Sequence, residues 1–409
     1  MGANLSFTGR IVSGMLLEKI DDGLFKPHYE RFSLVNLANF VLKHFNAQPI
    51  HDPYPLEHFI SGISEGIEKI VFFLIDALGM SSLERLMNRE RVFHEYVVIE
   101  ATSVFPTTTS AAITSLLTGA TPVEHGVLGY ILYIRQLGTL LNMIELSSPI
   151  VGKVTSTLSN RELMFEKTIF ERLLEVGVKS FVLTSKTIRG SGLSNLVNVG
   201  ASVRSYQSFG DMFSKFREIL QENGPFFGFV YWGLLDSIGH KLGVDSDAFE
   251  SELYWLLKML MREILPVLPH NTLLIVLGDH GQIFTPWEKE TWWSWKDEVS
   301  TFFSVPPGGE MRMMHIYTNQ PDAVVQYLNE KYRDRALVLT KEQALNEKLF
   351  GEAVVVPGAS VERIGDVVLI ARENYSFYFK YTGKEESLKS KHGSLTQEEL
   401  LVPLMIFRR

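Results

Sequence analysis

The chain of 409 residues contains no cysteine, which excludes disulfide bridges and thiolate metal sites. Any metal ion would therefore be bound by His, Asp or Glu side chains. No apolar run reaches the roughly 18 residues that a transmembrane helix needs, so we expect no contact with a membrane. The opening segment 1–30 also lacks the apolar core of a signal peptide, and the expected compartment is the cytoplasm.

Positive charge is scarce as well. Lys and Arg total 39 against 47 Asp and Glu, and the formal net charge is −8. A protein that wraps a nucleic-acid polymer would carry a basic surface, so we expect no such partner. Small phosphorylated molecules are not excluded, because a bound metal ion can supply positive charge locally. With 45% hydrophobic and 21% charged residues, the composition is otherwise that of an ordinary globular protein.

Short apolar runs alternate with amphipathic, helix-like segments along much of the chain. The runs are typical of buried parallel strands and cover 71–76, 97–105, 179–185, 226–232 and 272–279. This alternation predicts an α/β fold, a three-layer α/β/α sandwich around a mostly parallel, doubly wound sheet. Ligands of such sheets bind beyond the carboxyl ends of the strands. Asp76, Asp236 and Asp279 all fall at or just after such ends.

The pattern changes after residue 282, where the chain becomes turn-rich and aromatic. We expect an inserted α+β subdomain over 284–362 and a core formed by 1–283 plus 363–409. The apolar runs 366–379 and 400–408 are expected to return to the main sheet and close it. The stretch WEKETWWSW (287–295) is typical of packing or an oligomer contact, with stacking against a nucleobase as the alternative.

The sequence GDHGQ (278–282) places Asp279 and His280 at the end of a predicted strand. Neighbouring side chains on a strand point to opposite faces, so these two can converge only where the chain leaves the strand. The flanking Gly278 and Gly281 permit that turn. A β-turn with an Asp cap and a surface histidine is the alternative interpretation.

Two further histidines stand near acidic or polar residues. In DSIGHKLG (236–243), Asp236 and His240 are four residues apart and would share one helix face, from which both could bind one ion. The alternative is a helix-initiating acid followed by a solvated histidine. His392 lies in a polar loop before a predicted helix start at Thr396, where a single histidine is more often solvated than ligating.

The stretch FPTTTSAAITSLLTG (105–119) ends a strand at Pro106 and then begins a helix after three threonines. A helix N-terminus there offers free N–H groups to an anion. A hydroxyl at this position is either a helix cap or a nucleophile. With three aspartates and three histidines nearby, the inventory suits two Zn²⁺ or Mn²⁺ ions, which would activate a threonine hydroxyl.

Taken in order, these motifs resemble the alkaline phosphatase superfamily, and specifically its type I phosphodiesterase/nucleotide pyrophosphatase branch. The resemblance rests on LIDALG (74–79), FPTTTSAAITSLLTGATPVEHGV (105–127), DSIGHKLG (236–243), GDHG (278–281) and KHG (391–393). It implies a nucleophile at Thr109, a first metal on Asp76, Asp279 and His280, and a second metal on Asp236, His240 and His392. It also implies a two-step reaction through a phospho-threonine. With those ligand positions filled, His125 is interpreted as structural.

At one position the chain departs from that family. Where the phosphodiesterase branch has an asparagine that binds a phosphate oxygen, this sequence has Tyr130, which can donate one hydrogen bond but differs in reach and bulk. The family's Phe-Pro-Asn after the nucleophile is also missing. The expected substrate is a small phosphodiester or nucleotide pyrophosphate. The alternatives are a phosphomonoesterase or phosphonate hydrolase and, more remotely, a phosphoryl-transferring mutase.

Overall fold

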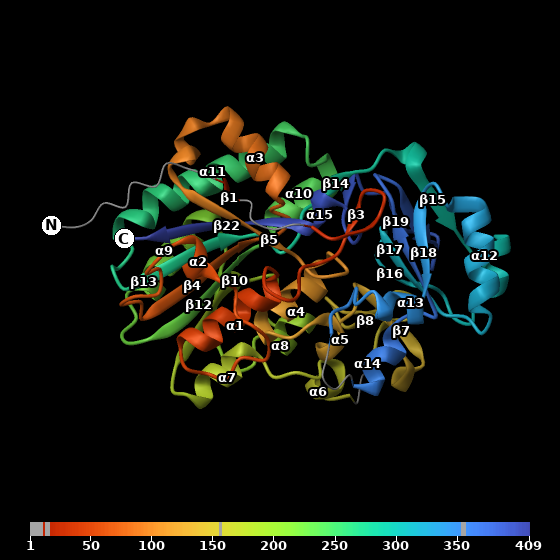
Figure 1. The fold of residues 1–409 in the computed structure, drawn as a ribbon, viewed down its shortest axis with the longest axis horizontal. Coiled ribbons are helices and arrows are strands. Elements are labelled where there is room, and N and C mark those ends of the chain that lie inside the picture. The colour runs from red at the N-terminus through yellow and green to blue at the C-terminus, as the bar shows by residue number, and fades with distance from the viewer. Residues whose placement is uncertain (1–10, 13–16, 155–157, 353–356) are drawn as a thin grey trace.

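The computed structural model of the chain describes residues 11–12, 17–154, 158–352 and 357–409. A large sheet with helices above and below it occupies one end of the molecule, and a second group of strands and helices occupies the other (Figure 1). In the part of the chain that the structure describes, no helix combines the length and the apolar character that crossing a membrane requires.

Eight strands of the described chain form the main sheet. Their order is β1 (Ile11–Val12), β5 (Val97–Thr102), β22 (Leu401–Arg408), β13 (Thr272–Leu277), β4 (Lys69–Ile75), β12 (Phe226–Trp232), β10 (Lys179–Ser185) and β11 (Ser202–Tyr206). β22 runs antiparallel to both of its neighbours, and the other pairings recorded in this sheet are parallel. The predicted mostly parallel sheet is confirmed, and it contains all five predicted strands as well as the run at 400–408.

Alternation along the buried strands creates two apolar layers. On β4, Phe72 and Leu74 belong to one hydrophobic core, and Phe73 and Ile75 belong to the other, because successive strand side chains point to opposite faces. The first core is covered by α1 (Leu34–His44), α4 (Thr109–Thr118), α7 (Ile169–Glu175) and α8 (Gly192–Val197). The second is covered by α3 (Met80–Arg89), α9 (Phe209–Leu220), α10 (Leu234–Leu242) and α11 (Asp247–Glu263). The fold is therefore the predicted α/β/α sandwich.

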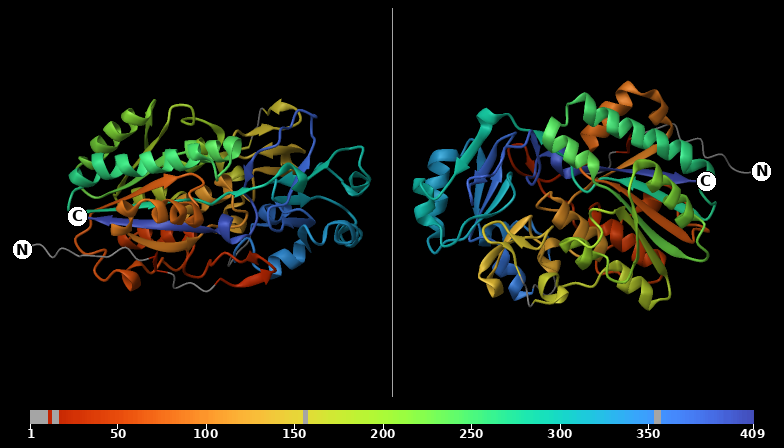
Figure 2. Two further views of the ribbon diagram at one scale, coloured as in Figure 1. Left: turned by 90° about the horizontal axis from the view of Figure 1, so that it is seen from above. Right: turned by 180° about the vertical axis from the view of Figure 1, so that it is seen from behind.

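A second sheet occupies the other end of the molecule. Its order is β18 (Ala336–Thr340), β19 (Val367–Ala371), β17 (Met313–Ile316), β16 (Gly308–Gly309), β6 (Ile131–Ile134), β7 (Thr139–Asn142), β8 (Ser147–Ser148) and β9 (Gly152–Lys153). Helix α12 (Pro321–Tyr332) packs on β18 and β19. Figure 2 shows the yellow strands of 131–153 at the same end as the cyan and blue strands. The division at 284–362 stays a prediction, and this sheet draws strands from both sides of it.

The expectation that 366–379 would close the main sheet is wrong. β19 pairs with β17 and β18 in the second sheet, and β20 (Ser376–Phe379) pairs with β15 (Glu290–Trp293). A continuous apolar run predicts a buried strand, but it carries no information on which distant strand becomes its neighbour. The strand character was correct, and the assignment of the strand to a sheet was not.

The aromatic stretch at 287–295 is used mainly for packing. Trp292 stacks on Tyr378 with ring centroids 4.0 Å apart, and Trp293 is 2% exposed against Phe377. These contacts join β15 to β20, and the two tryptophan side chains are therefore used in packing at the end of the molecule that holds the second sheet, which we call the second lobe. Trp287, at 76% exposed, is the tryptophan of the stretch that is most open to solvent.

Candidate active site

Three neighbouring strands bring the predicted aspartates to one edge of the main sheet. Asp76 follows β4, Asp279 comes two residues after β13, and Asp236 lies on α10, directly after β12. Because β13, β4 and β12 are adjacent and parallel, their carboxyl ends meet at the same place. His392 reaches this edge from the loop after β21 (Ser390–Lys391), which pairs with β14 (Ile283–Phe284).

The loops after β4 and β13 are pressed together by glycines. A Cβ on Gly278 would lie 2.0 Å from the carbonyl oxygen of Leu78, and one on Gly281 would lie 1.9 Å from the carbonyl oxygen of Glu398. Neither glycine takes a positive φ. They are thus required by close backbone approach, and not by the turn conformation that the sequence suggested. This packing fixes the separation of the two loops that carry Asp76 and Asp279.

Thr109 stands at the start of α4, beside the first group of predicted ligands. Its Oγ1 lies 3.1 Å from Nε2 of His280 and 3.4 Å from Oδ1 of Asp76. Nε2 of His280 is in turn 3.5 Å from Oδ1 of Asp76 and 3.5 Å from Oδ2 of Asp279. The predicted nucleophile and the predicted first ligand set therefore converge on one point.

The second predicted group adjoins the first. Oδ1 of Asp236 lies 3.3 Å from Nε2 of His240 and 3.8 Å from Nε2 of His392. Potential ligand atoms of these three side chains all lie within 4.8 Å of one another, and the same holds for Asp76, Asp236 and His280. Asp236 is thus shared between the two groups. The His280 and His392 rings stack with centroids 3.9 Å apart.

Backbone carbonyls fix the orientation of all three imidazoles. The Nδ1 atoms of His240, His280 and His392 lie 2.8, 3.0 and 2.9 Å from the carbonyl oxygens of Ser390, Gly281 and Thr107. A carbonyl oxygen can only accept a hydrogen bond, so each Nδ1 carries the proton and donates it. Each Nε2 then presents a lone pair toward the carboxylates, which is the arrangement that metal-binding histidines adopt.

Burial leaves the site short of positive charge. Loss of water raises the pKa of Asp76 well above its usual range, and the neighbouring Asp279 and Asp236 raise it further. Burial likewise raises the pKa of Asp279, whose Oδ2 is buried without a hydrogen-bond partner. Burial and the nearby His280 and His240 lower the pKa of His392 far below its usual value. A cation between these groups would offset the repulsion among the carboxylates, and a neutral imidazole such as that of His392 is the form that binds one.

Two side chains that donate hydrogen bonds to the aspartates were not among the predicted site residues. The Tyr231 hydroxyl donates to Oδ2 of Asp76, and the Gln282 side-chain amide donates to Oδ1 of Asp236. Both residues stand in motifs already singled out, Tyr231 at the end of a predicted strand and Gln282 as the last letter of GDHGQ. The role of Thr107 could not be predicted from its residue type, because the group that orients His392 is its backbone carbonyl oxygen.

Two predicted residues lie apart from the cluster. The Tyr130 hydroxyl accepts a hydrogen bond of 2.7 Å from Asn142, and among the described residues it makes none to Thr109 or the predicted ligands. Its substrate-binding role stays a prediction. His125 is fully buried, donates from Nε2 to the Ser115 hydroxyl at 2.9 Å and accepts at Nδ1 from the Val127 amide. These contacts agree with the structural interpretation of His125.

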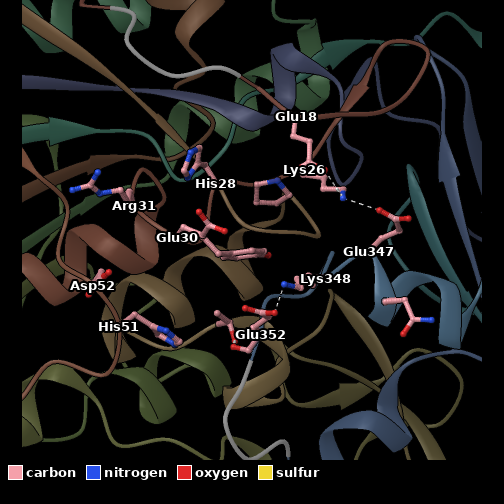
Figure 3. A pocket seen from close by; sticks show the side chains of 14 residues that line it. Glu18, Lys26, His28, Glu30, Arg31, His51, Asp52, Glu347, Lys348 and Glu352 are labelled. Carbon is pink, nitrogen blue, oxygen red and sulfur yellow. Dashed lines mark hydrogen bonds and ion pairs between the residues drawn. The ribbon is translucent and has the colours of Figure 1, made fainter.

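A separate polar cavity of about 760 Å³ lies between the segment 26–31 and the segment 346–352 (Figure 3). None of the predicted ligands lines it. Lys26 bridges Glu18 and Glu347, so this lysine is already paired within the protein. Among the described residues, the groups of side chains whose atoms converge closely enough to bind a metal ion are those of the aspartate and histidine cluster, and we therefore take the cluster as the candidate active site.

The sandwich fold with this cluster at the strand ends defines an alkaline phosphatase-like hydrolase of phosphoric esters. The family model for type I phosphodiesterase/nucleotide pyrophosphatase matches residues 70–395, and the chain belongs to that family. The predicted family is confirmed. None of the curated proteins compared with the chain matches it.

Solved structures show the same fold. Murine ectonucleotide pyrophosphatase/phosphodiesterase 5 is 18% identical, with a TM-score of 0.62 over 83% of this chain and 87% of that chain. An inactive threonine-to-alanine variant of the murine protein in complex with AMP gives a TM-score of 0.60 at 18% identity, over the same shares of the two chains. Phosphonoacetate hydrolase from Sinorhizobium meliloti 1021, in complex with phosphonoformate, is 17% identical, with a TM-score of 0.62 over 84% of this chain and 90% of that chain.

Proposed function

We propose that the protein hydrolyses a small phosphodiester by attack of Thr109 on phosphorus, with two divalent metal ions held beside it. The observation that carries this proposal is the position of Thr109, the first residue of α4. Its Oγ1 lies 3.1 Å from Nε2 of His280 and 3.4 Å from Oδ1 of Asp76. The first-turn amides of α4 have no helical partners and favour an anion at the same point. The proposal therefore places the phosphate next to both the Thr109 hydroxyl and these amides.

The residues present fit a pair of zinc or manganese ions. Asp76, Asp279 and His280 would hold one ion, and Asp236, His240 and His392 would hold the other. The buried, unpartnered Oδ2 of Asp279 and three Nε2 lone pairs aimed inward support this assignment. Bound metal would act as a Lewis acid and offset the negative charge of the phosphate oxygens.

The protein's own groups then define a two-step reaction. Thr109 Oγ1 lies beside Asp76 and His280, two of the residues that would hold the first ion. The hydroxyl proton, whose loss a metal held there would favour, passes to water as the oxygen attacks, and the departing oxygen takes up a proton from water. Attack in line with the leaving group breaks its bond to phosphorus and forms a phospho-threonine. Water then hydrolyses the phospho-threonine and returns Thr109 to its starting state. An inactive threonine-to-alanine variant of the murine neighbour is consistent with such a nucleophile.

Charge near the site favours a diester over a monoester. Two cations close to His392 are already paired, Lys391 with Glu290 and Arg312 with Glu399. Neither is free to bind the second negative charge of a phosphomonoester. The phosphonate hydrolase alternative is supported by the fold of the Sinorhizobium protein alone. A higher kcat/KM on p-nitrophenyl phosphate than on a p-nitrophenyl diester would favour the monoesterase, and turnover of phosphonoacetate would favour the phosphonatase.

The nucleophile is tested by Thr109→Ala. We expect kcat/KM on bis(p-nitrophenyl) phosphate to fall by at least about 10³-fold, because the attacking oxygen is lost. Zinc binding measured by calorimetry should persist, since the six proposed ligands remain. Thr114→Ala on the same helix is the matched control, because its hydroxyl only bonds back to the Ser110 carbonyl. Turnover by Thr109→Ala within tenfold of the wild-type rate would exclude the assignment.

The cytoplasmic location expected from the sequence also stays a proposal. It would be contradicted if the chain, expressed in its own host with an affinity tag, were recovered from the medium or from the cell surface.

A further inference from the structure

An apolar recess of about 280 Å³ opens beside Thr109. Ile113 and Leu117 stand four and eight residues beyond Thr109 and line the recess with it, along the same face of α4. Leu193 and Val197 of α8 line it as well. The recess therefore begins at the proposed nucleophile and continues between two helices that cover one face of the main sheet.

The walls of this recess are poorly suited to two kinds of ligand. No lysine or arginine is found among its described lining residues, so it offers no cation to a further phosphate group, although Thr187, Ser191 and Asn198 supply neutral polar groups. Its aromatic members are Phe229, which is 3% exposed, and Tyr231, whose hydroxyl is engaged by Asp76. Tyr231 is thus the one partly exposed ring among the described lining residues, and the recess has no pair of open aromatic faces between which a nucleobase could stack. The exposed Glu145 is the one charged residue in the described lining.

We propose that this recess binds an uncharged apolar substituent, an alkyl or aryl group, on the phosphodiester that Thr109 attacks. This inference rests on the proposed function and specifies its substrate class. In an in-line displacement the leaving group points away from the nucleophile. A group lying alongside Thr109 is therefore the substituent that stays on phosphorus. The substrate class that follows is an apolar phosphodiester, and not a nucleotide pyrophosphate.

The first test varies the retained group at a constant leaving group. Methyl, propyl and hexyl esters of p-nitrophenyl phosphate should show kcat/KM rising by about 3-fold for each added methylene until the recess is filled. The 5′-p-nitrophenyl ester of thymidine monophosphate should not exceed the hexyl ester. A flat chain-length series, or preference for the thymidine ester, with the methyl ester still turned over, would overturn the recess proposal and leave the hydrolase intact.

The second test places charge at the recess wall. Ile188 is half-buried and lines the recess, so Ile188→Lys should lower the ratio of hexyl to methyl kcat/KM by at least about 10-fold. The ratio is the readout because it cancels any general loss of active enzyme. Val199→Lys, at a 36% exposed aliphatic side chain just beyond α8 and outside the recess, is the matched control and should keep the wild-type ratio.

Failure of the proposed hydrolase function can be distinguished from failure of the recess proposal. If no ester is turned over, the proposed hydrolase function fails, and the recess is judged by binding alone. Calorimetry should then give a Kd for hexyl phosphate at least about 10-fold lower than for methyl phosphate. Equal affinities, or an Ile188→Lys variant that is folded by circular dichroism and keeps the wild-type preference, would overturn the recess proposal.

Discussion

At the scale of single residues, the site depends on groups that hold the predicted ligands as much as on the ligands. Tyr231 and Gln282 donate to Asp76 and Asp236, and three backbone carbonyls fix the imidazoles. The motifs identified the side chains that meet at the cluster because their types are chemically distinctive. Carbonyl partners cannot be found that way, since every residue has one. The recess beside Thr109 was likewise not predictable, because its walls come from segments distant in sequence.

Removal of the Tyr231 hydroxyl should shift the pH dependence of the enzyme. Its hydrogen bond lowers the pKa of Asp76 against the raising effects of burial, Asp279 and Asp236. In Tyr231→Phe the pKa of Asp76 should therefore rise further, and protons should compete with metal up to a higher pH. We expect the acidic limb of the pH profile of kcat/KM to move up by about one unit. Tyr327→Phe, on exposed α12, is the control, and an unmoved acidic limb in Tyr231→Phe would contradict the role.

At the scale of elements, a buried ion pair joins the two lobes. Arg312 precedes β17 of the second sheet, and its guanidinium donates to both carboxylate oxygens of Glu399 on α15 (Gln397–Leu400) at 2.8 Å. Both side chains are fully buried. Glu399 also accepts from the amide of Ser394, and its own carbonyl accepts from the amide of Gly281. This pair therefore supports the two loops that carry His392 and His280.

Removing one partner of the Arg312–Glu399 pair should lower the free energy of unfolding by more than the intact pair contributes to it, because the remaining charge is buried without a partner. Arg312→Met leaves a buried carboxylate without its cation, and we expect the free energy of unfolding in guanidinium to fall by about 3–5 kcal/mol. Adding Glu399→Gln to that variant should recover part of the loss, because the stranded charge is removed. The exposed pair Lys331–Glu298 is the control, where Lys331→Met should cost less than about 1 kcal/mol. An equally small loss in Arg312→Met would refute the expectation.

The strands themselves were largely predictable, and their neighbours were not. Every apolar run assigned to the main sheet up to residue 279 lies in it, because a buried parallel strand has a composition of its own. The run at 366–379 has the same composition and belongs elsewhere. Strands β6 to β9 are short and join partners more than 150 residues away through Gly309. Such pairing is a property of the folded chain, and local pattern does not encode it.

At the scale of the whole molecule, the cluster of carboxylates makes stability depend on metal and pH. In the metal-free chain the folded-state pKa values of Asp76 and Asp279 lie above their usual range. The stability that these groups contribute is thus fully present below a pH of about 4 and is lost as pH rises through the raised values. A bound cation removes this penalty because it compensates both carboxylates, and it stabilises the folded state by mass action.

Chelation should therefore inactivate and destabilise the protein together. After treatment with EDTA we expect hydrolysis of bis(p-nitrophenyl) phosphate to be lost and Tm to fall, with the fall larger at pH 8 than at pH 5.5. Zn²⁺ or Mn²⁺ should restore both, as followed by differential scanning fluorimetry and the absorbance of nitrophenolate. The Asp279→Asn variant should show a smaller fall in Tm on chelation, because one repelling charge is absent. Activity and Tm unaffected by EDTA would exclude the two-metal interpretation.

The position of β22 has a consequence for biosynthesis. This strand, at residues 401–408, lies between β5 and β13, so the main sheet stays divided into two parts until it arrives. Before β22 is synthesised, the edges of β5 and β13 that it covers have no partner strand. Unpaired strand edges are templates for aggregation. A chain in which β22 is detached therefore exposes the edges of both β5 and β13 to other strands.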